Sequence, residues 1–413
     1  MKALILTAYF PPSTKVGASR VAGWVRHFPA FEIDTYVIRP AVPEGAASEK
    51  NGPGESTVLA VKIPSTFLSK MLIGQPPVWL RWFGPLMRVM SYAMTSWNPY
   101  FPFYIKGLEL IRSDGIDVIL ATGEPFHLFA IAAKLSKKTG IPWIADYRDA
   151  WSGNYDVDFY SYPRKWFTRH VMGRIEKGVV RSASLITTVS LPLTQLFEKK
   201  FPEIPVHCHM NGYDAGIMPS SALPRKNQGM LTFAYAGTIY PYQRSDIFFE
   251  TLIKAREKGL LTEFCVEMYG LDDNSRDLVR KYENALQGHM VFVPRLDGSE
   301  LMQQLSRVDV LLVFANAGID GSCTKIYEYL ALSRRILCVI NDHSTLELLV
   351  KKFNAGHCCE NADDLMEIII KLSDELKKDG QIKQERANFD LFEKRVLIGE
   401  FSSELIRRFN GND

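Results

Sequence analysis

The sequence has 413 residues, more than a single hydrophobic core usually supports, so two domains are expected. Hydrophobic residues make up 46% of the chain and charged residues 23%, which is the balance of a folded protein and excludes a disordered one. A formal charge of +3 is small for this length and gives no case for nucleic-acid binding.

Three local features bear on the compartment. The six cysteines lack paired CxxC spacing, so free thiols in a reducing cytoplasm are expected and a metal site is not. The start, MKALILTAYFPP, predicts a β-strand, because its apolar run is too short for a signal peptide. The longest uncharged span, 89–105, contains Pro99 and Pro102 and makes a poor transmembrane helix.

The first half of the chain alternates between strand and helix patterns. Its first strand, 2–8, runs through the loop YFPPSTKVGASR into a helix, which is the opening of a Rossmann-like domain. No GxGxxG occurs, so no bound dinucleotide is expected. Gly17 would let the backbone approach a ligand closely; the alternative is a tight turn that needs small residues. Further strands are expected at 33–38, 58–63, 117–121, 142–145 and 185–190.

Residues 66–104 hold three Trp, four Phe and three Tyr, with a few basic residues and no acidic one. Aromatic and basic residues broken by prolines suit short helices in a membrane interface. The alternatives are a helical pair packed against the sheet and an acceptor pocket lined by aromatic rings. Residues 163–181 add a basic helix, with six Lys or Arg and one Glu.

The sequence DYRDAW, 146–151, follows the strand at 142–145. Residues just past the carboxyl ends of parallel strands line the ligand crevice of an open α/β sheet. Arg148, flanked by Asp146 and Asp149, is therefore either an internally paired loop clamp or part of a site that holds an acceptor hydroxyl.

After a polar linker at 215–229, a second α/β series begins. Strands are expected at 231–235, 265–269, 291–293, 308–314, 335–340 and 356–359, and a last helix at 389–409. Two parallel-sheet domains follow, with the crevice between them as the expected ligand site.

The stretch 316–331, NAGIDGSCTKIYEYLA, joins the strand at 308–314 to a helix through a turn of small residues. This arrangement aims backbone N–H groups at an anion. Asp320 in the turn and Glu328 in the helix suggest sugar hydroxyls as partners, with a phosphate between them. The alternative is an ordinary βα unit with a surface Asp and Glu.

Several segments in series resemble the retaining glycosyltransferases of family 4. They are FPP…G, GIPWIADYRDAW, ITTVS, NGYD, YAGTIY…R, VDVLLVF and GSCTKIYEYLALSRRILCV. The resemblance covers nearly the whole chain, and DYRDAW and TKIYEYLA look like the subset that builds bacterial surface polysaccharides. It implies an α/β GT-B fold: two Rossmann-like domains facing a deep interdomain cleft. Residues 1–215 would be the acceptor side and 216–387 the nucleotide-sugar domain, with a helix in 388–413 packing back towards the first domain.

The resemblance also implies roles for the residues of the second domain. Asp320, where the family usually has Glu, would face the donor sugar, and Glu328 the nucleotide ribose. The backbone between them would meet the diphosphate at a helix N-terminus; its residues are Gly321, Ser322, Cys323 and Thr324.

The family places an Arg next to the glycine that ends the first strand of this domain, and a Lys several residues on. This chain has Thr238 after Gly237, and Arg244 near the Lys position, so one cation is missing. Lys325 is the expected substitute, although a solvated first-turn Lys is the alternative. Fixed cations would stabilise a departing nucleoside diphosphate more than the ground state.

The remaining family positions are less sharply assigned. Arg295 would stack on the base or lie on the surface, Gly17 matches the glycine loop over the donor phosphates, and Asn211 matches a turn at the crevice. No side-chain nucleophile can be named, and no metal or other cofactor is expected, since backbone N–H groups and cations can neutralise the diphosphate.

The function expected from this resemblance is retaining transfer of a sugar from a nucleotide-diphosphate donor to a lipid-linked glycan, at the inner face of the cell membrane. Basic and aromatic residues of the first domain motivate the peripheral membrane contact. The alternatives are a nucleotide-sugar epimerase of the same architecture and a non-catalytic nucleotide-sugar-binding partner of a glycan assembly complex.

Overall fold

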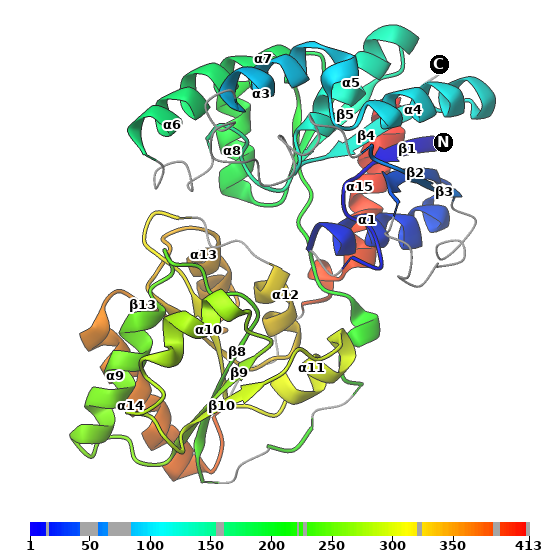
Figure 1. Cartoon of the computed structure of the whole chain (residues 1–413). Helices are drawn as coiled ribbons and strands as arrows, with labels where there is room; N and C mark the ends of the chain where they lie inside the picture. The colour runs from blue at the N-terminus through cyan, green and yellow to red at the C-terminus, as the bar shows by residue number, and fades with distance from the viewer. Residues whose placement is uncertain are drawn as a thin grey trace. The chain divides into compact units, whose positions relative to one another are not determined.

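The chain folds into two compact units. The computed structural model describes residues 1–13, 16–41, 57–64, 84–153, 161–220, 223–225, 229–319, 324–382 and 389–409. Unit 1 comprises Met1–Met210 and Arg395–Asp413, and unit 2 comprises Asn211–Lys394. The sequence placed these limits at 215/216 and 387/388. Each unit is an α/β domain built on one parallel sheet (Figure 1).

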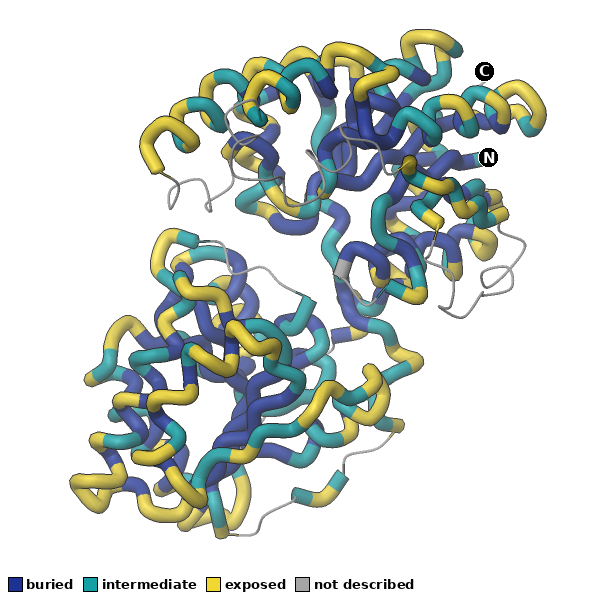
Figure 2. The backbone as a smooth tube through the Cα atoms, in the orientation of Figure 1, coloured by how far each residue is buried: buried dark blue, intermediate teal, exposed yellow. Residues whose placement is uncertain are grey.

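Unit 1 has a seven-stranded sheet in the order β3-β2-β1-β4-β5-β6-β7. All its strand pairs are parallel. Every residue of β4, β5 and β6 is buried, because helices cover both faces of the sheet (Figure 2). The strands are β1 (Lys2–Leu6), β2 (Asp34–Pro40), β3 (Thr57–Val61), β4 (Val118–Thr122), β5 (Trp143–Tyr147), β6 (Leu185–Thr188) and β7 (Val206–Cys208).

The helices of unit 1 include one that returns from the C-terminus, as the sequence predicted. Phe401 on α15 stacks on His209 at a ring distance of 4.5 Å and tilts against Trp24 of α1 at 6.0 Å. Figure 1 shows α15 beside α1. The helices are α1 (Val16–His27), α3 (Gly84–Ala93), α4 (Phe101–Asp114), α5 (His127–Thr139), α6 (Tyr162–Trp166), the π-helix η5 (Phe167–Met172), α7 (Gly173–Val180), α8 (Leu191–Lys200) and α15 (Lys394–Phe409), with 3-10 turns η1 (Phe28–Phe31) and η3 (Thr95–Trp97).

The aromatic segment at 66–104 is described from residue 84 onward, and 66–83 lie outside the described residues. The ring of Tyr92 on α3 stacks on His127 at 4.3 Å, and Ser91 contacts His127 Nε2 at 3.0 Å. Phe103 on α4 is fully buried. This part is therefore a helical pair packed in the unit 1 core, although Leu86 and other large apolar side chains on it remain exposed. No helix in the described ranges is long and apolar enough to cross a bilayer.

Unit 2 has a six-stranded parallel sheet in the order β10-β9-β8-β11-β12-β13. Helices α9 and α14 lie side by side against one face and contribute to the core of this unit (Figure 1). The strands are β8 (Leu231–Ala236), β9 (Phe264–Tyr269), β10 (Met290–Val293), β11 (Val310–Phe314), β12 (Arg335–Val339) and β13 (Gly356–Cys359). The helices are α9 (Ser245–Glu257), α10 (Asp273–Arg280), α11 (Gly298–Leu305), α12 (Thr324–Ala331), α13 (Thr345–Lys352) and α14 (Ala362–Asp379), with 3-10 turns η6 (Ala215–Ile217) and η7 (Asp390–Phe392).

The alternation of strand and helix expected from the sequence is confirmed in both units. Two expected helices differ: the basic helix at 164–180 is divided into α6, the π-helical turn η5 and α7, and the last helix, expected at 389–409, is the 3-10 turn η7 followed by α15. The expectation of a deep cleft concerns the placement of the two units, and it stays a prediction.

Candidate functional site

The candidate site in unit 2 lies where the strand order reverses. β8 is central, with β9 on one side and β11 on the other, so the chain leaves the ends of β8 and β11 in opposite directions. Ligands of open α/β sheets bind at the carboxyl ends of the strands beside such a switch point. The loop after β8 and the start of α12 meet at this point, which the following contacts show.

Lys325 lies against the end of β8. Its Nζ donates to the Tyr235 hydroxyl at 3.0 Å and lies 4.2 Å from the centre of that ring. A Cβ added at Gly237 would lie 3.3 Å from Lys325 Cε and 3.4 Å from Nζ. Lys325, expected from the sequence as the substitute cation, is thus next to Gly237. In the resembled family, an Arg follows the corresponding glycine.

The loop that Lys325 contacts is fixed on its other side by α10. The Ile239 N–H donates to Ser275 Oγ at 2.8 Å, and Thr238 Oγ1 donates to Asp272 Oδ2 at 3.2 Å. Asp272 also caps α10 by accepting from the Ser275 N–H at 2.8 Å. Thr238 is therefore part of a rigid loop, and the pKa of Asp272 is lowered, first by its bonds with Ser275.

Arg244 also lies at the carboxyl ends of these strands, because its backbone is hydrogen-bonded there. Its N–H donates to the carbonyl of Ala315, the residue after β11, at 3.1 Å. Its side chain is 47% exposed and donates to Asp246 at 2.9 Å. The hydrogen bond with Asp246 raises the pKa of Arg244. The guanidinium is charged and open to solvent, with a carboxylate already paired to it.

Glu328 lies one turn into α12. Burial raises the pKa of its carboxyl group, and Lys394 and Lys325 act against that rise. Thr324, at the start of the same helix, has a buried Oγ1 without a hydrogen-bond partner among the described residues. A polar ligand at this helix start would satisfy the Thr324 hydroxyl. Asp320, Gly321, Ser322 and Cys323 lie outside the described residues.

Arg295 follows β10 and is exposed. Gly270, at the end of β9 with φ +60°, lies so close that an added Cβ would be 3.4 Å from Arg295 Cα. Arg295 therefore lies at the same edge of the sheet as the end of β9. A neighbouring cation that the sequence analysis missed is Arg276, whose guanidinium lies 4.1 Å from the ring centre of Phe292.

In unit 1, Arg148 holds three loops together. Its Nε donates to the Gly123 carbonyl, its NH2 donates to the Glu124 carbonyl at 3.0 Å, and its guanidinium lies 5.6 Å from the Tyr9 ring. A Cβ at Gly17 would overlap this guanidinium. The close approach at Gly17 is therefore made by a protein side chain, and Arg148 bonds to backbone carbonyls of the loop after β4.

Asp146, expected on the acceptor side, is fully buried. Arg20 NH2 donates to its Oδ1 at 2.7 Å, and Thr187 donates to the same oxygen at 2.8 Å. Its partners are protein groups inside unit 1, whereas Asp149 is exposed and Asn211 is partly buried.

A second buried carboxylate, Glu176, fixes the loop that follows β5. It accepts from Tyr147 Oη at 2.9 Å and from Ser152 Oγ at 2.5 Å, and pairs with Lys200 at 2.6 Å. Sequence reasoning missed this residue because it is the single Glu in a basic helix and reads as a surface charge.

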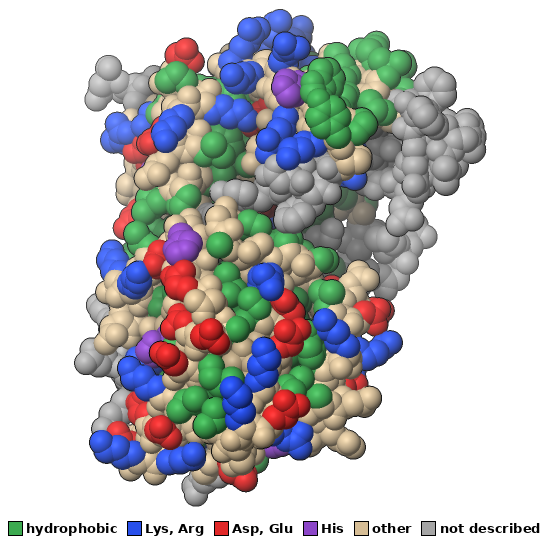
Figure 3. Space-filling model, turned by 90° about the vertical axis from the view of Figure 1, so that its left-hand side faces the viewer, with side chains coloured by type: hydrophobic (Ala, Val, Ile, Leu, Met, Phe, Trp, Pro, Cys, Tyr) green, Lys and Arg blue, Asp and Glu red, His purple; other side chains and the backbone are tan. Residues whose placement is uncertain are grey.

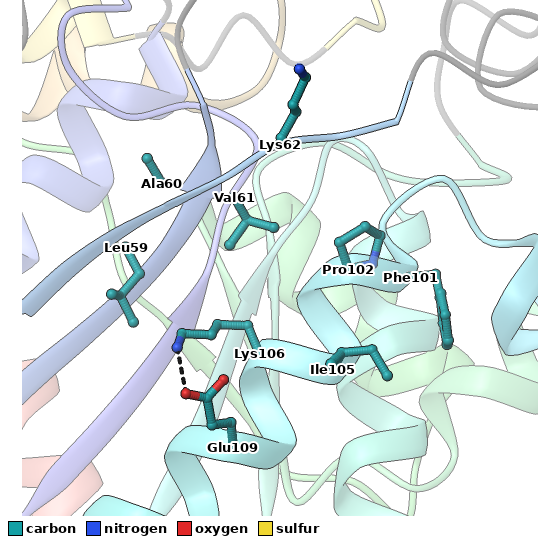
Figure 4. Close-up of a pocket in the computed structure, with 9 residues that line it drawn as sticks. All are labelled: Leu59, Ala60, Val61, Lys62, Phe101, Pro102, Ile105, Lys106 and Glu109. Atoms are coloured by element: carbon teal, nitrogen blue, oxygen red, sulfur yellow. Dashed lines mark hydrogen bonds and ion pairs between the residues drawn. The ribbon is translucent and has the colours of Figure 1, made fainter.

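Two further features involve other residues. His343, Glu347 and Glu360 bring potential metal-ligand atoms within 4.8 Å of one another, and Asn341 and Lys351 also bind this group. A pocket of about 510 Å³ lies between the edge strand β3 and α4 (Figure 4). Its lining is mostly apolar and contains none of the expected site residues; Leu59, Ala60, Val61, Lys62, Phe101, Pro102, Ile105, Lys106 and Glu109 form it.

No protein-family model matches the sequence, and comparison with curated proteins finds no match. Solved structures do match. Sucrose-phosphate synthase from Thermosynechococcus elongatus has a TM-score of 0.68 at 12% identity, over 100% of both chains. A glycosyltransferase from Rickettsia africae ESF-5 has a TM-score of 0.64 at 10% identity, over 100% of this chain and 99% of that chain.

The chain has the GT-B fold. A protein from Listeria monocytogenes classed as a UDP-N-acetylglucosamine 2-epimerase is also similar, with a TM-score of 0.55 at 13% identity over 100% of this chain and 97% of that chain. Identities this low establish the fold, and an activity has to be argued from the residues.

Proposed function

We propose that the protein is a glycosyltransferase that moves a sugar from a nucleotide-diphosphate sugar to a glycan acceptor. The observation that carries this proposal is the Lys325 ammonium held beside Gly237 at the switch point of the unit 2 sheet. A diphosphate needs fixed positive charge, and Lys325 places an ammonium group at the start of α12. The transferases among the structural neighbours add support.

The chemistry we propose follows from the charge of the leaving group. When the sugar departs, negative charge grows on the diphosphate, so Lys325 and the exposed Arg244 stabilise the transition state more than the ground state. Glu328 would accept hydrogen bonds from the ribose. Transfer would proceed on one face with retention, as in family 4, and the leaving phosphate oxygen would help to deprotonate the acceptor. No metal is required if these groups neutralise the diphosphate.

We also propose a lipid-linked acceptor of surface-polysaccharide synthesis, reached at the inner face of the membrane. The α6–α7 surface, defined as the exposed side chains of α6, η5 and α7, supports this. Tyr162 and Trp166 on it are 80% and 49% exposed. Its only acidic residue, Glu176, is buried in its pair with Lys200, so the surface presents positive charge alone.

The composition of this surface matches an anionic bilayer. Basic side chains attract anionic headgroups, and Trp and Tyr rings enter the interface. On the face seen in Figure 3, Lys and Arg side chains of unit 1 gather beside hydrophobic ones. The exposed basic residues of this surface are Arg164, Arg169, Arg174 and Lys177, and the exposed Arg181 directly follows α7.

Flotation with vesicles containing phosphatidylglycerol tests the membrane proposal. The wild-type protein should float at low salt, and Trp166→Ala combined with Arg169→Glu should abolish flotation. Lys377→Glu, an exposed charge change on α14 of unit 2, is the matched control and should float like the wild type. Absence of wild-type flotation at low salt would point to a soluble acceptor.

A thermal-shift screen across nucleotide sugars, followed by turnover with a lipid-linked acceptor, tests the transferase proposal. A true donor at a hundredfold excess over Kd should stabilise the fold by about 2.7 kcal/mol. Conversion of the donor without any acceptor would indicate an epimerase instead. Binding without turnover, in the presence of acceptor, would indicate a non-catalytic sugar-nucleotide protein.

A further inference from the structure

Tyr235 is a buried residue of β8 whose hydroxyl has two polar partners. Its side chain is 1% exposed, yet the hydroxyl donates to the Thr238 carbonyl at 2.6 Å and accepts from Lys325 Nζ at 3.0 Å. A phenol has one hydrogen and free lone pairs, so both bonds form at once. The phenol therefore links the loop after β8 to the first turn of α12.

The ring of Tyr235 contributes as well. The Lys325 ammonium lies 4.2 Å from its centre, which is cation–π distance, and the ring itself stacks on Phe314 of β11 at 4.7 Å. The core of unit 2 thus fixes the ring, and the ring fixes the position of the charge.

Gly237 also lies against Lys325. A Cβ at 237 would lie 3.3 Å from Lys325 Cε, a tight contact, and φ at Gly237 is +95°, where residues with a Cβ are strained. Ser275 and Asp272, at the start of α10, hydrogen-bond the next residues of this loop. The loop against which the Lys325 ammonium lies is therefore fixed.

We propose that Tyr235 is a positioning residue that holds the Lys325 ammonium where the diphosphate of the donor binds. This inference rests on the proposed function. A lysine side chain that is free to rotate loses rotamer entropy on binding an anion, and one already seated loses less. Tyr235 would therefore act through Lys325 on affinity for the diphosphate and on stabilisation of the departing group.

Titration calorimetry with inorganic pyrophosphate, at fixed ionic strength, tests this role. Lys325→Met should weaken binding by roughly tenfold, the usual loss for one charge-assisted hydrogen bond. Tyr235→Phe keeps the ring and removes the hydroxyl, so a loss of about three- to tenfold is expected. Tyr240→Phe, at an exposed tyrosine of the same loop, is the matched control and should bind like the wild type.

The double variant separates positioning from a merely structural role. If Tyr235 acts through Lys325, Tyr235→Phe adds no further loss of affinity to Lys325→Met. Gly237→Ala adds a Cβ that presses on Lys325 Cε, so it should also weaken pyrophosphate binding, and it serves as the second variant if Tyr235→Phe folds poorly.

Wild-type affinity in Tyr235→Phe, or additive losses in the double variant, would overturn the inference and leave the transferase proposal standing. Failure of the wild-type protein to bind either pyrophosphate or any nucleotide sugar would overturn both. The two failures are therefore distinguishable.

Discussion

Replacing Asp146 by Asn tests whether this residue of DYRDAW acts in the fold or on a substrate. The carboxylate is fully buried, and Arg20 donates to it from Nε at 3.1 Å and from NH2 at 2.7 Å. The change removes the carboxylate that pairs with the 5% exposed Arg20.

Removing one partner of a buried ion pair costs about 3–5 kcal/mol, because the other charge stays desolvated. Arg20 also donates to the His209 carbonyl at 2.9 Å and Thr187 still has an amide oxygen to bind, so the lower end of that range is expected. For a domain of this size, about 3 kcal/mol corresponds to a fall in Tm of roughly 6–12 °C.

Urea unfolding and calorimetry on the full chain measure this loss. Asp149→Asn, at the exposed neighbour, is the control and should change stability by no more than about 0.5 kcal/mol. The double change Arg20→Met with Asp146→Leu should recover much of the loss, since a buried ion pair can be replaced by apolar side chains. A variant Asp146→Asn as stable as the wild type, but impaired in turnover, would refute the structural role and restore the acceptor-contact interpretation.

Three further predictions concern single residues. Gly237→Ala should lower stability by roughly 1–3 kcal/mol through backbone strain and also weaken pyrophosphate binding, whereas Gly259→Ala, at φ +67° with open space around it, should show the strain alone. Burial lowers the pKa of His127 from 6.5 to about 3, so the unfolded chain binds the proton first and acid favours unfolding. Stability should fall by about 1.4 kcal/mol per pH unit from this group as pH drops from 6 to 4, and urea titrations of His127→Gln should lack that share. Arg244→Ala should lower turnover by roughly a hundredfold or more if its charge faces the leaving group, and wild-type turnover would remove it from the site.

The strand framework was predictable from the sequence, because strands of a parallel sheet covered on both faces appear as short, continuous apolar runs. VLLVF in β11 and VILAT in β4 are fully buried along their length, as such runs require. The return of the last helix to unit 1 also followed from the resemblance. Lys325 could be singled out as a candidate cation because it stands in the turn-to-helix segment after β11.

The partners of the polar groups were decided by the tertiary structure alone. Lys325 meets Tyr235 across 90 residues, and Arg20 meets Asp146 across 126. Such pairs depend on which strands are neighbours and on the register between them, and hydrophobic periodicity carries neither. For the same reason the sequence predicted that a ligand could approach Gly17, where the structure places the Arg148 guanidinium. Composition and pattern determined the elements and the residue types of the site, and packing determined which charges are buried in pairs and which charged side chains lie at the strand ends of unit 2.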